Sequence, residues 1–261
     1  MPPFKPDDAD FKEAVVDGKK RRVLSRARFE AFNTSLLGLG DLTRAATIVD
    51  AVVGVFELEG LAEYCRAAES DIAIPFLINE FLFWLVEQIK QEMRRQEHDD
   101  GVLLWSPLPI FIKFTGEGVI VIWDAAGESE VARRNIIANT LVICRNYRDF
   151  LAGIRRRLPD TPGVLRCALA CGTVYSLGNG NDFVGAPILN ATRLNRLQGI
   201  TFCFDIRGFS LRDADKKDWT RREIIVKRVA VAGYGENQFV GLLRTESRGF
   251  TWEEKRQFKS V

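Results

Sequence analysis

The sequence predicts an α+β protein built on one mixed β-sheet, and two observations carry this prediction. Several short runs rich in β-branched and apolar residues are bounded by glycine or polar residues, which is typical of strands. Two long segments instead repeat apolar residues at the spacing of one helix face. The order of these segments along the chain favours a single sheet with helices packed on one side of it.

The first half of the chain is expected to hold an arm, two helices and a strand. Residues 1–22 are charged and contain proline, so we expect a loose arm. Residues 24–38 predict a short helix that is ended by Gly38 and Gly40. The β-branched run at 47–58 predicts a buried strand. Residues 75–95 predict an amphipathic helix, because their apolar residues recur at the spacing of one helix face, and Pro75 suits its first turn.

The second half is expected to hold a hairpin, two helices and the remaining strands. Residues 97–108 are polar and predict a loop, and two apolar runs at 112–123 then flank Gly116-Glu117-Gly118. Glycine on both sides of the glutamate lets the backbone turn sharply, so these runs predict a β-hairpin. The other expected elements are helices at 129–157 and 186–197 and strands at 165–175, 200–204, 224–232 and 238–243.

We expect one principal domain, because the 261 residues show no internal repeat and no linker. The expected divisions are an N-terminal arm and helical extension at 1–45, a globular domain at 46–243 and a C-terminal tail at 244–261. Apolar residues make up 46% of the chain and charged residues 28%, an ordinary balance for a soluble protein. A formal net charge of +2 lacks the strongly basic character of nucleic-acid-binding domains, so no nucleic-acid partner is expected.

Cysteine and histidine usage narrows the possible chemistry. The five cysteines are odd in number and scattered, and none forms a Cys-x-x-Cys motif, so a reducing cytoplasmic setting is expected. The only histidine, His98, excludes histidine-based triads and multi-histidine metal sites. We expect no apolar run of membrane-spanning length and no signal-type N-terminus, and therefore no membrane partner.

Two acidic residues at expected strand ends are the candidate metal ligands. Glu57 lies at the end of the strand predicted at 47–58, and Glu117 lies at the tip of the hairpin. Mg²⁺ takes oxygen ligands and is usually held by one or two carboxylates together with substrate phosphates. Adjacent strand ends carrying these carboxylates would suit a Mg²⁺–triphosphate ligand. The alternative is an ordinary hairpin with solvated glutamates and no ligand.

Three segments in order resemble the catalytic domain of class III nucleotide cyclases, the adenylate and guanylate cyclase family. Residues 56–62 (Phe-Glu-Leu-Glu-Gly-Leu-Ala) match the family's Phe-x-Asp-Ile-x-Gly-Phe-Thr pattern. Residues 112–118 match its Ile-Lys-x-x-Gly-Asp-Gly hairpin, with glutamate in place of aspartate. Residues 182–194 resemble the strand-to-helix segment that ends in Ala-Ala-Arg-Leu. The resemblance spans residues 46–242 and implies that the domain at 46–243 is a nucleotide cyclase catalytic domain.

The resemblance implies a role for individual residues. Glu57 and Glu117 take the positions of the family's metal-binding aspartates, and each side chain is one methylene longer. Lys113 and Asp182 match the pair that contacts the base, and this pair fits either adenine or cytosine. Arg193 matches the arginine that stabilises charge on the α-phosphate, and Arg196, one helical turn later, is an alternative.

Two residues of the family pattern, which contact the ribose and the terminal phosphates, are replaced by apolar residues in this sequence. The asparagine that orients the ribose falls on Leu189, and the adjacent Asn190 is the candidate substitute although it points about 100° away on a helix. The lysine that contacts the terminal phosphates falls near Ala232. Lys227 or Arg228 could supply that charge, but neither matches the motif.

The resemblance therefore implies an enzyme that converts a nucleoside triphosphate to a 3′,5′-cyclic mononucleotide and pyrophosphate with Mg²⁺ or Mn²⁺. In this family the site is shared between two catalytic domains, so a homodimer is implied. The departures suit a divergent branch, such as the stand-alone bacterial pyrimidine cyclases of anti-phage defence (Pycsar systems), which make cUMP or cCMP. The alternatives are an adenylate or guanylate cyclase and a non-catalytic module that dimerises or binds nucleotide.

Overall fold

The computed structural model describes residues 7–35, 37–66, 70–209 and 222–261, which fall into two compact units. The larger unit comprises Asp50–Thr173 and Gly185–Val261, and the smaller one joins the residues before Asp50 to Val174–Val184. The helices are η1 (Asp8–Asp10), α1 (Arg26–Glu30), α2 (Leu61–Arg66), α3 (Ser70–Met93), α4 (Glu130–Ile154), α5 (Ala186–Asn195), α7 (Arg244–Arg248) and α8 (Trp252–Gln257). The strands are β1 (Phe11–Val16), β2 (Lys19–Leu24), β3 (Thr47–Glu59), β4 (Arg94–His98), β5 (Gly101–Leu104), β6 (Phe111–Phe114), β7 (Gly118–Asp124), β8 (Val164–Leu177), β9 (Asp182–Val184), β10 (Phe202–Asp205), β11 (Ile224–Val231), β12 (Gly235–Leu243) and β13 (Lys259–Ser260).

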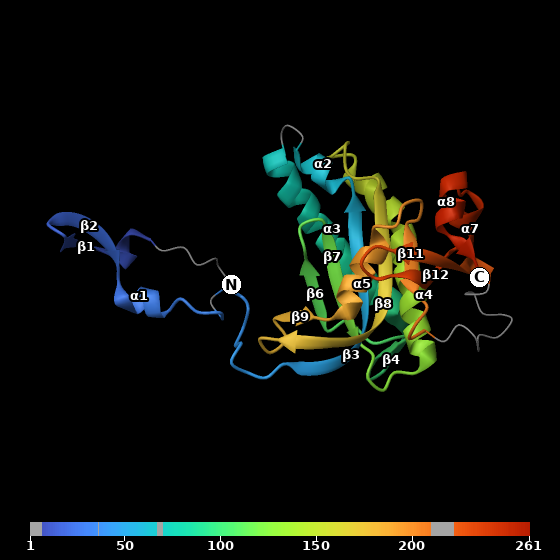
Figure 1. Cartoon of the computed structure of the whole chain (residues 1–261), viewed down its shortest axis with the longest axis horizontal. Helices are drawn as coiled ribbons and strands as arrows, with labels where there is room; N and C mark the ends of the chain where they lie inside the picture. The colour runs from blue at the N-terminus through green and yellow to red at the C-terminus, as the bar shows by residue number, and fades with distance from the viewer. Residues whose placement is uncertain (1–6, 36, 67–69, 210–221) are drawn as a thin grey trace. The chain divides into compact units, whose positions relative to one another are not determined.

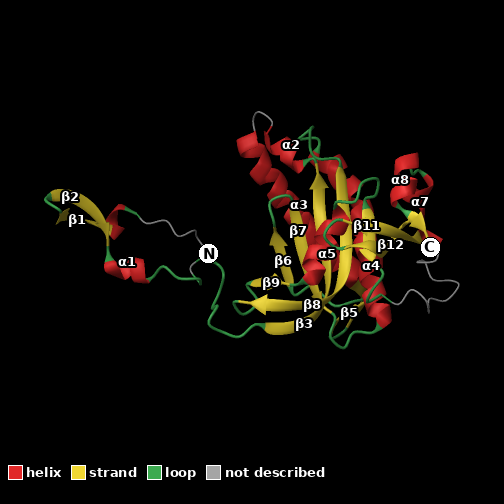
Figure 2. Cartoon of the chain, in the orientation of Figure 1, coloured by secondary structure: helices red, strands yellow, loops and turns green. Residues whose placement is uncertain are grey.

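One mixed sheet forms the centre of the larger unit, as the sequence predicts. Its strand order is β13-β11-β12-β10-β8-β3-β7-β6. Figures 1 and 2 show this sheet with β3, β7 and β8 among its strands. β3 pairs with β7 and β6 with β7 in antiparallel fashion, whereas β10 runs parallel to β8. The predicted hairpin is therefore confirmed as β6–β7, and it lies beside the strand that carries Glu57.

Helices cover both faces of this sheet, which corrects the expectation that they pack on one side. Alternate residues of β8 point to opposite faces. Leu169 joins a buried cluster with α3 and α4, whereas its neighbour Ala168 joins a second cluster with Leu194 of α5. The sequence hides this arrangement because β8 and β10 are apolar on both faces and read as continuous hydrophobic runs.

α3 and α4 form the layer behind the first face. α3 buries a stripe with a four-residue period, and the ring of Trp84 lies 5.1 Å from that of Phe150 of α4. Pro75 lies inside α3, not in its first turn, so the predicted start of this helix is wrong. The segment Ile72–Met93 is also long and apolar enough to span a membrane by length and composition, contrary to expectation. One stripe of this helix is buried against α4. The stripe consists of Leu77, Phe81, Leu85, Ile89 and Met93.

Three segments expected to be irregular or helical form other structure. β1 and β2 pair around Asp17 and Gly18, both at positive φ, where a loose arm was expected. The helix predicted at 24–38 is limited to α1, which has no buried residue. β4 and β5 replace the loop predicted at 97–108, and their side chains are almost all exposed. Charged, exposed strands lack the apolar alternation on which the prediction depends.

The segment after Leu243 packs against the second face of the sheet. Phe250 and Phe258 stack with ring centroids 4.8 Å apart and belong to the buried cluster of α5. Glu246 of α7 accepts a hydrogen bond from the backbone N–H of Thr201 at 2.9 Å, and its Oε2 atom is buried. Burial therefore raises the pKa of Glu246 above its ordinary value of 4.5.

Glu246→Gln is expected to remove one source of pH-dependent instability. Because the folded chain holds the Glu246 proton more tightly, the stabilising contribution is complete below the ordinary pKa and is lost as pH rises through the raised one. Glutamine keeps an acceptor for Thr201 and does not ionise. Urea unfolding from about pH 4 to about pH 8 should show the variant gaining free energy of unfolding relative to wild type as pH rises. A difference that stays constant with pH would contradict this account.

Candidate active site

Glu57 and Glu117 face one pocket on the sheet face that α5 covers. Glu57 lies near the end of β3, and Glu117 lies in the turn between β6 and β7. Gly118 pairs with Glu57, and a Cβ on this glycine would lie 2.0 Å from the carbonyl oxygen of Phe56. Only glycine permits this close approach, and the approach brings the two acidic residues to one place. The pocket has a volume of about 380 Å³ and is also lined by Val55, Thr115, Gly118, Ile120, Thr192 and Arg196.

The last turn of α5 supplies polar groups to this pocket. Asn195 is 3% exposed and donates from Nδ2 to Oε2 of Glu57 at 2.9 Å. This bond holds one carboxylate oxygen of a long, rotatable side chain and leaves the other oxygen available for a ligand. Arg196 lines the same pocket, so a cation of the same chain lies close to the two acidic residues. Asn195 could not be predicted from the sequence, because 138 positions separate it from Glu57.

Lys113 lies on the pocket face two strands from Glu57. It pairs with Ile120 of β7, which pairs in turn with Val55 of β3, and both partners line the pocket. Cross-strand partners share a face, so the exposed Lys113 side chain projects on the same side of the sheet as Glu57. The structure thus brings three predicted residues, Lys113, Glu57 and Glu117, to one face.

The other two predicted substrate-binding positions lie on β9 and α5. Asp182 belongs to the smaller unit, where it pairs with Leu177 and accepts from the backbone N–H of Phe183 at 2.9 Å. Asn190 lies half-buried in the middle of α5, and its neighbour Leu189 is 55% exposed. An exposed leucine at this place supplies no polar group for a sugar.

Arg193 projects from α5 toward the turn between β11 and β12. Its Nη1 donates to the carbonyl oxygen of Gly233, which is at φ +70°. Arg193 therefore lies at a different place from Arg196, which lines the pocket with the glutamates. The three-residue spacing of the two arginines separates the directions of their side chains by about 60° around the helix.

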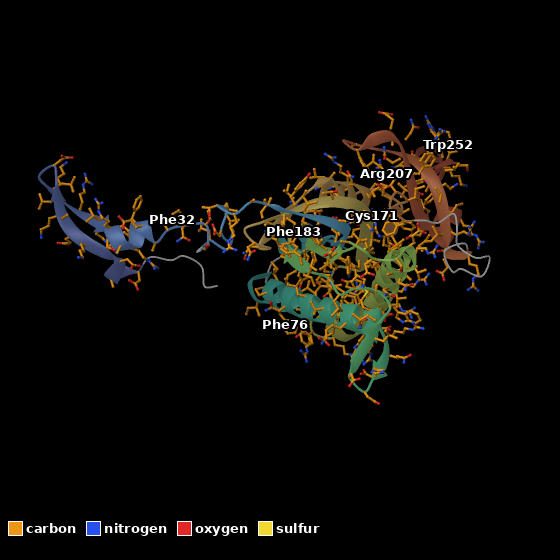
Figure 3. All side chains as sticks on the ribbon, turned by 90° about the horizontal axis from the view of Figure 1, so that it is seen from below. Phe32, Phe76, Cys171, Phe183, Arg207 and Trp252 are labelled. Atoms are coloured by element: carbon orange, nitrogen blue, oxygen red, sulfur yellow. The ribbon has the colours of Figure 1, made fainter. Side chains whose placement is uncertain are left out.

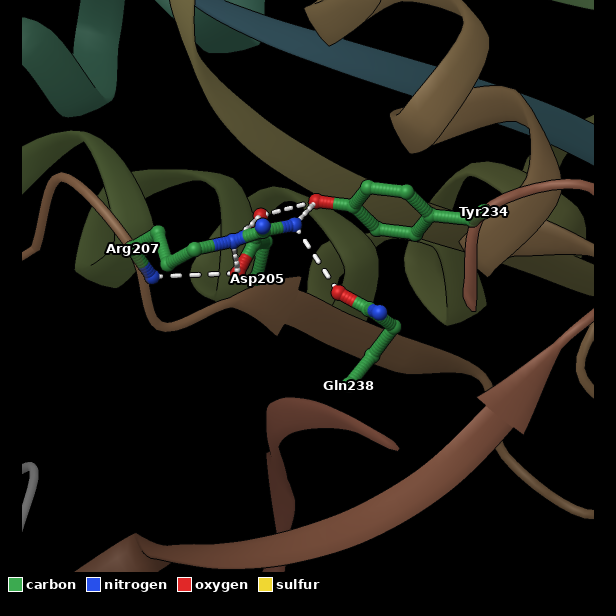
Figure 4. Close-up of polar contacts among 4 residues, drawn as sticks. All are labelled: Asp205, Arg207, Tyr234 and Gln238. Carbon is green, nitrogen blue, oxygen red and sulfur yellow. Dashed lines mark hydrogen bonds and ion pairs between the residues drawn. The ribbon is translucent and has the colours of Figure 1, made fainter. Parts of the chain in front are cut away.

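A polar cluster that the sequence did not predict lies beside this turn. Asp205 ends β10 and is 3% exposed, and it accepts hydrogen bonds from Arg207 and from the hydroxyl of Tyr234 (Figure 4). Arg207 also donates to Gln238 of β12 at 2.9 Å. Gly208 approaches Cys171 so closely that a Cβ would lie 2.4 Å from the Cβ of that cysteine, and Figure 3 shows Arg207 near Cys171.

The donor set of the pocket fits a hard divalent cation that also binds phosphates. Two carboxylates, Glu57 and Glu117, and the hydroxyls of Thr115 and Thr192 line it. Within the described ranges, no group of three or more histidine, cysteine or acidic side chains gathers at one point. Two carboxylates alone match the way in which Mg²⁺ is held when a substrate supplies the remaining oxygen ligands.

Solved structures with the same fold are nucleotide cyclases. The adenylyl cyclase CyaB from P. aeruginosa superposes with a TM-score of 0.56 at 14% identity, over 77% of this chain and 96% of that one. The guanylyl cyclase Cya2 gives 0.55 at 12% identity, over 77% and 93%. A bacterial light-regulated adenylyl cyclase gives 0.52 at 14% identity, over 84% and 58%. No protein-family model and no curated protein matches the sequence.

These likenesses confirm the predicted fold. The chain has the α+β fold of class III adenylyl and guanylyl cyclase domains, with a central mixed sheet and packed helices. At such low identity the likeness concerns the fold, and the chemistry has to be argued from the residues at the site.

Proposed function

We propose that this protein is a nucleotide cyclase that converts a nucleoside triphosphate to a 3′,5′-cyclic mononucleotide and pyrophosphate. The observation that carries the proposal is the pocket shared by Glu57 and Glu117, whose carboxylates lie at the β3 and β6–β7 strand ends. The three solved structures of the same fold are adenylyl and guanylyl cyclases. A pair of acids kept at both positions favours a working site over an inactive module.

In the proposed reaction, the ribose 3′-oxygen attacks the α-phosphorus, the bond to the bridging oxygen of pyrophosphate breaks, and the hydroxyl proton leaves to water. Glu57 and Glu117 would hold Mg²⁺ or Mn²⁺, which supplies charge that neutralises the triphosphate. Asn195 fixes the orientation of Glu57 through its 2.9 Å hydrogen bond. Arg193 stabilises the negative charge that develops on the α-phosphate oxygens.

We propose that the working enzyme is a homodimer with two shared sites. Glu57 and Glu117 belong to one chain, and Arg193, Lys113 and Asp182 act from the other. Support comes from Arg193, which is seated on Gly233 and not in the pocket that Glu57 lines. A two-fold axis would place the metal-binding residues of each chain opposite the substrate-binding residues of its partner, which makes two equivalent sites.

The base is proposed to be a pyrimidine, with cUMP or cCMP as a second messenger of bacterial anti-phage signalling. A lysine and an aspartate can pair with the N3 acceptor and N4 amine of cytosine as well as with adenine. The apolar Leu189 and Ala232 at two positions of the family pattern favour a divergent branch over a standard adenylate cyclase. Cyclisation of ATP or GTP is the second candidate, favoured by the cyclases that share the fold.

Incubation with each ribonucleoside triphosphate, with Mn²⁺ or Mg²⁺, tests the proposal. Cyclic products are resolved by mass, and the expected result is a 3′,5′-cyclic mononucleotide together with pyrophosphate. The base of the product decides between the pyrimidine and purine candidates. Absence of every cyclic product with both metals would leave the non-catalytic module as the remaining reading.

Asn195→Ala is expected to weaken metal binding about 10-fold, because a residue that orients a ligand commonly contributes that much. Without the 2.9 Å bond, the Glu57 side chain gains rotamers that do not bind the cation. Calorimetric titration of the full chain with Mn²⁺ measures the effect. Asn146→Ala is the matched control, since Asn146 donates to Gln88 at 2.8 Å on the α3–α4 layer. Equal affinities in the two variants would show that Asn195 does not support a metal ligand.

A further inference from the structure

The turn between β11 and β12 is shaped to receive the Arg193 guanidinium. The Tyr234 N–H donates to the Val231 carbonyl at 2.9 Å, which closes the turn. A Cβ on Gly233 would lie 3.1 Å from Cζ of Arg193, so the guanidinium rests directly against the backbone. The positive φ of Gly233 aims its carbonyl at Nη1 of Arg193. The position of Arg193 therefore depends on the position of this turn.

A buried carboxylate holds the same turn from the other side. Asp205 accepts from Nε of Arg207 at 3.0 Å, from the backbone N–H of Arg207 at 3.0 Å and from the hydroxyl of Tyr234. Arg207 also donates from Nη2 to the Tyr234 hydroxyl, so that hydroxyl accepts from the arginine and directs its own proton to Asp205 (Figure 4). The phenol can fill both roles in only one orientation.

The chemistry of this cluster makes its geometry rigid. A carboxylate that is 3% exposed is costly to bury unless its oxygens receive charged or neutral donors. Loss of the Tyr234 hydroxyl removes one of those donors from Asp205 and the acceptor of one Arg207 N–H. Linked hydrogen bonds strengthen one another, so the cluster acts as a unit. Burial and the bond to Asp205 also raise the pKa of Tyr234 and keep the phenol protonated.

We propose that Tyr234 and Asp205 are positioning residues for Arg193, an inference that rests on the proposed cyclase function. The path runs from Asp205 through the Tyr234 hydroxyl to the turn, and from the Gly233 carbonyl to the guanidinium. Arg193 must meet the α-phosphate at a defined point, and a displacement of about 1 Å can cost about 100-fold in rate. Arg207 acts within the cluster, because its charge is paired with Asp205.

Tyr234→Phe tests the inference, with Tyr147→Phe as matched control. Each change removes one tyrosine hydroxyl. The Tyr234 hydroxyl bonds to Asp205 and Arg207, and the Tyr147 hydroxyl donates to the Pro162 carbonyl at 2.7 Å behind the opposite sheet face. Tyr234→Phe is expected to lower kcat about 10-fold with KM within about twofold, whereas Tyr147→Phe keeps kcat although it loses stability. Equal kcat losses in the two variants would overturn the inference.

Three further variants separate positioning from direct substrate contact. Asp205→Asn should lower kcat at least as much as Tyr234→Phe, because Arg207 loses its ionic partner. Arg207→Lys should recover part of the kcat that Arg207→Met loses, since a lysine can still donate to Asp205. A rise in KM with unchanged kcat in Arg207→Met would instead show that Arg207 binds substrate directly, and the positioning role would be rejected.

A measurement that does not depend on catalysis tests this inference independently of the proposed function. In the full chain, the Nη1 protons of Arg193, which donate to the Gly233 carbonyl, should exchange with water about 10-fold faster in Tyr234→Phe than in Tyr147→Phe, with their resonances assigned through Arg193→Lys. Unchanged exchange would overturn the positioning role even in an active enzyme. If wild type forms no cyclic product, the proposed function fails, while this measurement still decides whether the cluster positions Arg193.

Discussion

Replacing Glu117 by glutamine is expected to lower cyclic-nucleotide formation by about 1,000-fold or more while leaving the fold intact. The change removes one of the two carboxylate charges that line the pocket but keeps the shape of the side chain. Glu117 is exposed in a turn, so the free energy of unfolding should change by no more than about 0.5 kcal/mol. Initial rates with mass-resolved products, together with urea unfolding curves, measure both effects.

A matched control and a contradicting outcome define this experiment. Glu253→Gln makes the same chemical change at an exposed position in the first turn of α8 and should retain wild-type rates. If Glu117→Gln keeps more than about a tenth of the wild-type rate, the carboxylate does not bind the metal that the mechanism requires. If it loses the rate only because it unfolds, the urea curve will show the shift.

Arg193→Ala is expected to lower kcat between about 100-fold and 1,000-fold with a smaller change in KM. The guanidinium acts on charge that develops in the transition state, so its loss affects the chemical step more than ground-state binding. Initial rates over a range of nucleotide concentrations separate the two parameters. Arg196→Ala is the informative companion, because Arg196 lines the pocket of Glu57 and not the β11–β12 turn. A larger kcat loss in Arg196→Ala would transfer the role to that residue.

Glu117→Gln and Arg193→Ala should each be inactive alone, and mixing the two variants should restore activity. Random exchange makes half of the dimers mixed, and each mixed dimer has one intact site of two, so the mixture should reach about one quarter of the wild-type rate. A native mass spectrum of the mixture checks that subunits have exchanged. If mixed dimers form and remain inactive, the shared-site arrangement is wrong.

The parts of the fold that the sequence could predict are those in which local chemistry and tertiary packing agree. The β6–β7 hairpin was predictable because Gly116 and Gly118 flank Glu117 between apolar runs, and the structure confirms it. The β1–β2 hairpin was not predicted although Asp17-Gly18 is a turn signal, because β2 is strongly charged and neither strand buries an apolar face. Apolar alternation predicts a strand only where one face is buried.

The candidate site also contains residues that could be predicted from the sequence and residues that could not. Glu57 and Glu117 were predictable because each ends a strand, and register then places them together. Asn195, Asp205 and Tyr234 could not be predicted, because their roles come from contacts between residues distant in sequence. Tyr234 and Asp205, for example, are 29 positions apart.

The two arginines beside the β11–β12 turn differ in how much positive charge they present to solution. Arg207 is paired with the carboxylate of Asp205, so the pair is nearly neutral at a distance. In the part of the chain that the structure describes, the Arg193 guanidinium donates to the backbone carbonyl of Gly233, which orients the cation and leaves its full charge. The attraction of this surface for polyanions should therefore come from Arg193, and added salt should weaken triphosphate binding less in Arg193→Ala than in Arg207→Met. Of the two arginines that contact this turn, Arg207 is therefore neutralised by a carboxylate and Arg193 is not.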